Sequence, residues 1–164
     1  MTQDNGRPVA GSHLVPARAN WLEEHRQLYL TNPRKAHYND LRDMGGFRFM
    51  PSLLLKTIGR KSGKTYFNPL AYFVYGPEVM IAASKGGHAE HPSWYLNLCE
   101  MKEIRFRIAD DVFVGPWRQL EGAERAKVWD FLEVMYPPFE DYKNATSREI
   151  PVIALQWREM VETL

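Results

Sequence analysis

The spacing of apolar side chains divides the chain into helical and extended segments. Between residues 17 and 30, large apolar side chains recur every three or four positions, which predicts an amphipathic helix that Pro33 ends. Three runs rich in β-branched and aromatic residues follow at 47–58, 66–75 and 79–83, separated by turns that contain glycine or proline. We expect these runs to form antiparallel strands.

Helices and strands are mixed in the rest of the chain. Apolar spacing predicts helices at 92–101 and 123–135, a hairpin of 104–108 and 112–120, and a last strand at 150–155. Pro137 and Pro138 should end the second of these helices, and 157–164 should add a final helical turn. Short antiparallel strands with helices inserted late indicate an α+β fold whose sheet could close as a barrel.

Composition and charge limit the classes of protein. The first 20 residues hold few large apolar side chains and read as a flexible arm, which leaves 21–164 as a single domain. The net charge of +1 gives no overall field for binding nucleic acid. Cys99 is the one cysteine, so no internal disulfide forms, and no secretory or membrane-spanning run is seen. We expect a cytoplasmic protein.

One stretch is basic and free of acid. Residues 45–77 contain no Asp or Glu, and their cations are Arg48, Lys56, Arg60, Lys61 and Lys64. The turn from Gly59 to Gly63 places cations and a hydroxyl where backbone N–H groups can also face phosphate or carboxylate oxygens. A solvated hairpin tip, with cations that protect the sheet edge, explains the same residues equally well.

Other cofactor motifs fail on spacing. Gly63-Lys64-Thr65 looks like the end of a phosphate-binding loop, but Gly59 and Gly63 enclose three residues rather than four, and an extended run follows. No glycine-rich dinucleotide motif opens a helix after a strand. His88 and His91 are too few to form a metal site, and Cys99 lacks the neighbours of a catalytic thiol.

Several segments together resemble the deazaflavin-dependent nitroreductases and quinone reductases. They are LLLKTIGRKSG at 53–63, NPL at 68–70, AASKGG at 82–87, HPSWYLNL at 91–98, YPPFEDY at 136–142 and TSREIPV at 146–152. Each motif is weak alone, but their order and spacing match that family from about residue 21 to residue 155.

The resemblance implies a split β-barrel, related to the flavin-binding split barrels, that binds coenzyme F-420 in a groove. By similarity, the phosphate end would be held by Arg60, Lys61 and Ser62, with Lys64 within reach of the same region. The ring would be lined by Asn68, Pro69, Ala82, Ala83, Ser84 and Lys85, and the pocket completed by Trp94 and Asn97. Tyr66 stands where the family usually has an arginine, and Phe139 where some members have a third tyrosine.

The implied activity is reduction of quinones, nitroaromatics or activated alkenes by hydride from the reduced coenzyme, which a separate enzyme would regenerate. A hydroxyl donor, either Tyr136, Tyr142 or Ser84, could stabilise charge that develops on the acceptor oxygen. Packing of the tyrosines, a structural cap at Ser84 and a core position for Trp94 are the alternatives.

Two other functions remain compatible with this sequence. One is an oxidoreductase that uses flavin mononucleotide, because related split barrels bind that cofactor in a similar groove. The other is a protein that binds the deazaflavin without catalysis. The sequence also leaves open a peripheral membrane contact through the N-terminal helix, which would give access to lipid quinones.

Overall fold

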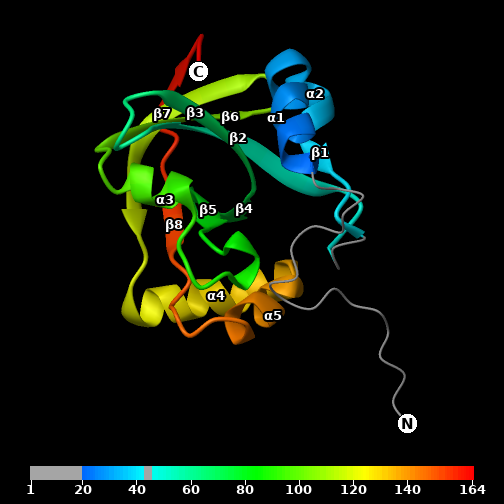
Figure 1. Cartoon of the computed structure of the whole chain (residues 1–164), viewed down its shortest axis with the longest axis vertical. Coiled ribbons are helices and arrows are strands. Elements are labelled where there is room, and N and C mark those ends of the chain that lie inside the picture. The colour runs from blue at the N-terminus through cyan, green and yellow to red at the C-terminus, as the bar shows by residue number, and fades with distance from the viewer. Residues whose placement is uncertain (1–19, 43–45) are drawn as a thin grey trace.

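The computed structural model describes residues 20–42 and 46–164, and the arm predicted at 1–20 lies outside this part except for Asn20. Within the described residues, the strands form one curled antiparallel sheet with helices at its side and at one end (Figure 1). This architecture confirms the predicted α+β split-barrel class. The division into an arm and one domain stays a prediction.

The bounds of the elements follow the sequence pattern with four exceptions, and two short elements, a strand at 38–39 and a 3₁₀ helix at 85–87, have no counterpart in that pattern. The strands are β1 (Tyr38–Asn39), β2 (Met50–Ile58), β3 (Thr65–Ala71), β4 (Phe73–Tyr75), β5 (Glu78–Ala82), β6 (Glu103–Ile108), β7 (Asp111–Gln119), β8 (Val152–Leu155) and β9 (Glu159–Val161). The helices are α1 (Trp21–Thr31), α2 (Pro33–Ala36), the 3₁₀ helix η3 (Lys85–Gly87), α3 (Ser93–Leu98), α4 (Gly122–Met135) and α5 (Pro138–Asn144). In the sheet the strand order is β1-β2-β6-β7-β8-β5-β4, with β3 paired to β2 and β9 paired to β7.

Two of the exceptions are short helices that start at a proline. Pro33 ends α1 as predicted, yet it also begins α2, and the Asn32 side chain caps α2 by accepting from the Lys35 N–H at 3.2 Å. Pro138 likewise sits in the first turn of α5. Proline suits this position because its fixed φ is helical and the N–H group that it lacks would have no acceptor within the helix.

The other two exceptions concern strands. The run 66–75 is not one strand, because it breaks at Tyr72: β3 pairs with β2, whereas β4 pairs with β5. The helical turn expected at 157–164 is wrong, because β9 pairs there with β7, with Val112 opposite Val161. The chain reaches β9 by crossing close to β7, where a Cβ atom on Gly115 would collide with the Gln156 carbonyl oxygen.

The core lies on both faces of the sheet. Alternate residues of β2 separate, so that Leu53 and Leu55 join one buried cluster while Leu54 packs on the other face with Tyr29 of α1 and Ala36 of α2. A further cluster lies between the sheet and the helices α4 and α5, which cover one end of the molecule in Figure 1. No helix in the described part of the chain is long and apolar enough to cross a membrane.

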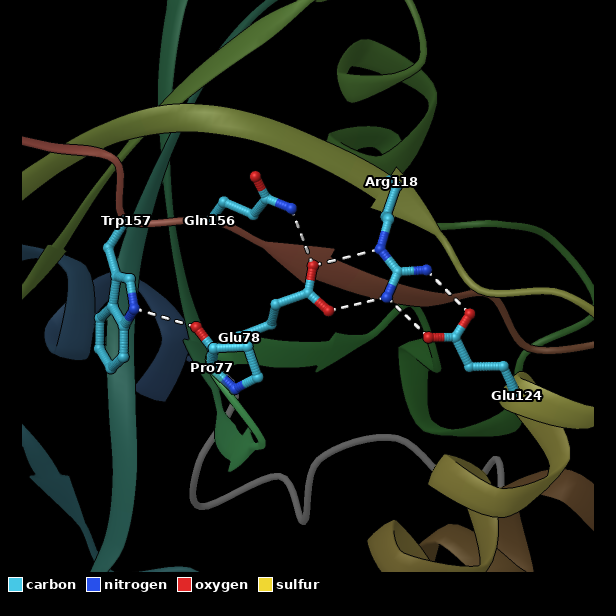
Figure 2. A network of polar contacts seen from close by, with 6 residues as sticks. All are labelled: Pro77, Glu78, Arg118, Glu124, Gln156 and Trp157. Carbon is cyan, nitrogen blue, oxygen red and sulfur yellow. Dashed lines mark hydrogen bonds and ion pairs between the residues drawn. The ribbon is translucent and has the colours of Figure 1, made fainter.

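An ion-pair network joins α4 to the sheet (Figure 2). The Arg118 guanidinium on β7 donates through Nη2 to Glu78 Oε2 on β5 at 2.7 Å and to Glu124 Oε1 on α4 at 2.7 Å. Gln156 Nε2 donates to Glu78 Oε1 at 3.1 Å. The hydrogen bonds from Arg118 hold the pKa of the Glu78 carboxyl below its usual value. The network therefore links β5, β7, the segment that follows β8 and α4 through one nearly buried carboxylate.

Candidate functional site

The basic turn connects β2 to β3 and is tightly folded. The Gly59 N–H donates to the Lys64 carbonyl oxygen at 2.8 Å, and the Gly63 N–H donates to the Gly59 carbonyl oxygen at 2.7 Å. Gly63 has a φ of 68°, which glycine adopts without strain. A Cβ atom on Gly59 would lie 2.7 Å from the Tyr66 ring, so a larger residue would displace the turn.

A buried amide on α3 orients the first cation of this turn. Asn97 is 6% exposed, and its Oδ1 accepts from the Arg60 backbone N–H at 3.2 Å and from Arg60 Nη1 at 3.0 Å. Asn97 was expected to complete the pocket. The structure places it beside Arg60, so its contribution to the site goes through the position of that guanidinium.

The next two cations are exposed. In the part of the chain that the structure describes, no acceptor or carboxylate contacts the ammonium group of Lys61 or Lys64. Ser62 Oγ lies 3.3 Å from the Tyr66 hydroxyl and accepts from the Lys64 N–H at 3.3 Å. Tyr66 thus joins the hydrogen bonds of the turn but brings no charge. The ammonium groups leave an uncompensated positive charge on this surface.

Asn68 and Pro69 lie next to this turn on β3. Their register opposite Leu55 and Leu54 of β2 fixes their position. Asn68 Nδ2 donates to Thr57 Oγ1 at 3.2 Å and to the Leu55 carbonyl oxygen at 3.4 Å, so its amide is oriented by its own hairpin.

The predicted ring-lining segment Ala82–Lys85 runs from the end of β5 into η3. The Ala83 N–H donates to the Pro151 carbonyl oxygen at 2.9 Å, and Ala83 is fully buried. Lys85 pairs with Glu90 at 3.4 Å. Trp94, at 9% exposure, packs in the same core cluster as Ala83 and Leu98, so most of its ring serves the core.

The two tyrosines meet through their hydroxyl groups. Tyr136 directly follows α4, Tyr142 lies on α5, and their hydroxyl oxygens are 3.3 Å apart. Burial raises the pKa of both phenols, so both remain protonated donors at neutral pH. Tyr136 is only 4% exposed, and its ring contacts Phe139 with centroids 4.9 Å apart. Tyr142 is the more accessible of the pair.

Helix α5 packs directly against η3. A Cβ atom on Gly87 would lie 2.7 Å from the Tyr142 carbonyl oxygen and 2.9 Å from Ala145 Cβ. The fold therefore brings Ser84 and Lys85, at the start of η3, together with the helix that carries Tyr142. We call η3, together with the adjoining part of α5, the η3 corner. Helix α3 lies between the η3 corner and the basic turn (Figure 1). The predicted residues occupy two corners joined by α3.

Sequence reasoning missed Arg148, which is central to the η3 corner. Its guanidinium hydrogen-bonds to His91 Nδ1 at 3.2 Å and to the carbonyl oxygens of Ala83, Ser84 and His88 at 3.2, 2.8 and 2.8 Å. The only signal was its place in the motif at 146–152. His91 is therefore engaged by an arginine.

Comparisons with known proteins show which family the sequence belongs to. Residues 32–156 match the family model described as F420H(2)-dependent quinone reductase. A curated F420H(2)-dependent quinone reductase of Mycobacterium tuberculosis (strain ATCC 25618 / H37Rv) is 32% identical over 152 residues, which cover 85% of this chain and 98% of the relative. Another protein of that strain carries the name as a provisional assignment and is 38% identical over 116 residues, covering 69% of this chain and 96% of the relative.

A solved structure leads to the same family. The structure of an F420-H2 dependent reductase (FDR-A) superposes with a TM-score of 0.57 at 38% identity, covering 63% of this chain and 93% of that chain. The haem storage protein of Vibrio cholerae, with a TM-score of 0.51 at 9% identity over 67% of this chain and 84% of that one, shares the fold alone. By its sequence and its architecture, the chain belongs to the F420H(2)-dependent quinone reductase family.

Proposed function

We propose that the protein binds reduced coenzyme F-420 along the surface from the β2–β3 turn, past α3, to η3 and α5, and reduces quinones there. The observation that carries this proposal is the uncompensated positive charge of Lys61 and Lys64, next to an Arg60 that Asn97 holds in place. Nitroaromatics and activated alkenes are further acceptors, because they too can accept a hydride.

The cations suit the anionic part of the coenzyme. Its phosphodiester and oligoglutamate tail carries several negative charges, and a charge-assisted hydrogen bond contributes about 1.5–3 kcal/mol. Arg60 is oriented before any ligand arrives, so less conformational entropy is lost when it binds an anion. Lys61 and Lys64, on their flexible stems, act as point charges.

The η3 corner would serve the reacting end. When bound, the reduced coenzyme supplies a hydride, which carries two electrons, and a quinone that receives it takes up one proton to become a hydroquinone. The backbone of Tyr142 lies against η3, and we place the acceptor where the Tyr142 hydroxyl would donate a hydrogen bond to its oxygen as negative charge develops there, with Ser84 as a second donor. Tyr136, through its hydroxyl 3.3 Å away, orients the Tyr142 hydroxyl.

A lipid quinone as acceptor would require the protein to approach a membrane. We place it in the cytoplasm, with a peripheral membrane contact on the side of α1, so that it can meet lipid quinones. Leu22 and Leu30 of α1 are exposed, and just before β2 Phe49 is 66% exposed beneath the Arg48 guanidinium. Exposed aromatic and basic side chains suit a lipid headgroup region. Co-sedimentation with anionic vesicles tests this contact, and a protein left entirely in the supernatant contradicts it.

The direct test combines binding with turnover. Calorimetry should show that coenzyme F-420 binds more tightly than flavin mononucleotide, and stopped-flow spectroscopy should show that a soluble quinone oxidises the reduced coenzyme faster with the protein than without it. Equal or tighter binding of flavin mononucleotide contradicts the cofactor. Tight coenzyme binding without acceleration by any quinone, nitroaromatic or activated alkene leaves a protein that binds the coenzyme without catalysis.

A further inference from the structure

One side chain, that of Arg148, bridges the two ends of the segment from Ala83 to His91. Arg148 donates to the carbonyl oxygens of Ala83 and Ser84 where the segment begins, and to the carbonyl oxygen of His88 and the ring of His91 where it ends. Between these two ends lies η3. The guanidinium therefore fixes the separation of the ends, which the backbone alone would leave free to vary.

The enclosed backbone needs such support. Three consecutive residues have positive φ: Lys85 at 47°, Gly86 at 62° and Gly87 at 78°. Lysine is strained in this region, because its Cβ crowds the backbone, at a cost on the order of 1–3 kcal/mol. Inside the loop, the Gly87 N–H donates to the Ser84 carbonyl oxygen at 2.9 Å and the His88 N–H to the Lys85 carbonyl oxygen at 3.2 Å. Such a conformation persists only when its surroundings hold it.

We infer that Arg148 is a positioning residue, which holds Ser84 and Lys85 where the coenzyme ring and its acceptor meet. This inference rests on the function proposed above. Arginine suits the task because its planar guanidinium offers five N–H donors in a fixed fork, so that one side chain serves acceptors in several directions. A lysine at 148 keeps the charge but cannot satisfy both ends of the segment at once.

His91 makes the hydrogen bonding of Arg148 sensitive to acid. Its Nδ1 accepts from Arg148 Nη1, which requires an unprotonated Nδ1. Burial and the nearby Arg148 charge lower the pKa of His91. The groups that face its ring are this guanidinium and the Tyr95 ring of α3, with centroids 4.9 Å apart, and no carboxylate among the described residues pairs with it. Protonation of His91 would remove one of the four contacts of Arg148.

The test compares R148K with R125K. Arg125 is a matched control, because it too donates to a backbone carbonyl oxygen, that of Ile150 at 2.6 Å, but contacts no part of the η3 segment. In R148K without coenzyme, hydrogen exchange should quicken at the amides of Gly87 and His88 and stay unchanged in β5 and β8. The single-turnover rate should fall by up to about 100-fold while coenzyme affinity changes far less, because misplacement of reacting groups acts on the chemical step.

A third variant adds a pH profile. Asn at position 91 can present a carbonyl oxygen to Arg148 and does not titrate, so H91N should lack the acid-side fall in rate that His91 protonation causes in the wild-type protein. An unchanged single-turnover rate in R148K overturns the inference, as does a loss of rate matched by faster exchange throughout the protein or by R125K. Identical acid limbs for wild type and H91N also contradict it. If the wild-type protein neither binds nor oxidises the coenzyme, the proposed function fails instead, and the exchange result still reports on the loop.

Discussion

Replacing Lys61 with alanine removes a single exposed cation from the proposed anion site. Lys61 lies in the turn between β2 and β3, and no described residue contacts its ammonium group. The free protein therefore loses no internal hydrogen bond or ion pair. We expect the melting temperature to stay essentially unchanged, because surface substitutions of this kind alter stability by at most about 0.5 kcal/mol.

The effect on coenzyme binding follows from charge and exposure. A charge-assisted hydrogen bond to a phosphate contributes about 1.5–3 kcal/mol. Solvent screens an exposed lysine, and ordering its flexible stem costs entropy, so the lower end of that range applies. Lys61→Ala should therefore weaken coenzyme affinity by about 1.5 kcal/mol, roughly tenfold. The difference should shrink as salt rises, since the screening length falls from about 10 Å at 0.1 M to about 3 Å at 1 M.

Isothermal titration at low and high salt measures both effects. Lys127→Ala is a matched control, because it removes the same exposed charge from α4, which lies at the other end of the molecule from the turn (Figure 1). The control should bind the coenzyme as the wild-type protein does. Unchanged affinity of Lys61→Ala at low salt would move the phosphate site elsewhere, and an equal loss in Lys127→Ala would reduce the effect to overall charge.

Further substitutions test the proposed hydroxyl donors, the packing of Gly87 and the ion pair of Glu78. Tyr142→Phe should slow single-turnover quinone reduction by about 10- to 100-fold with little change in coenzyme affinity, and Tyr136→Phe should slow it less; wild-type rates in both variants would make the pair purely structural. Gly87→Ala should destabilise the protein by at least about 1 kcal/mol in urea unfolding, because its positive φ and the Tyr142 backbone leave no room for a Cβ; unchanged stability would refute this packing. The Glu78 pKa is held low by Arg118, so the stabilising effect of this carboxylate is present above about pH 4.5 and is lost as pH falls through the lowered value; the melting temperatures of wild type and Glu78→Gln should converge on acidification, and a constant gap would contradict the linkage.

Much of the fold could be predicted because its signals are local. The apolar spacing of α1 and α4 and the extended runs of β2, β5 and β8 each lie within one segment. The acid-free composition of the turn by itself also indicates a basic surface. These features depend on neighbouring residues, whose periodicity the sequence displays directly.

Other elements depend on pairing with strands that are distant in the sequence. The run 66–75 has one extended pattern, but its two halves pair with different strands, β2 and β5. Residues 159–161 form a strand because β7 offers a partner, although their local pattern is no stronger than that of a helix end. Strand formation reflects packing and pairing with the neighbouring strand more than intrinsic preference, so local reading failed there.

In the candidate site, too, some features belong to the sequence and others to the tertiary structure. The sequence by itself determined which residue types are present: the cations of the turn, the glycines of η3, and the tyrosines on either side of the prolines. The tertiary structure alone decided how they are held, through contacts such as Asn97 with Arg60, 37 residues apart, and Arg148 with Ser84, 64 residues apart. Periodicity describes side chains that share one helix or strand, whereas the partner of a buried polar group is set by how distant segments pack, and that partner fixes where each functional group points.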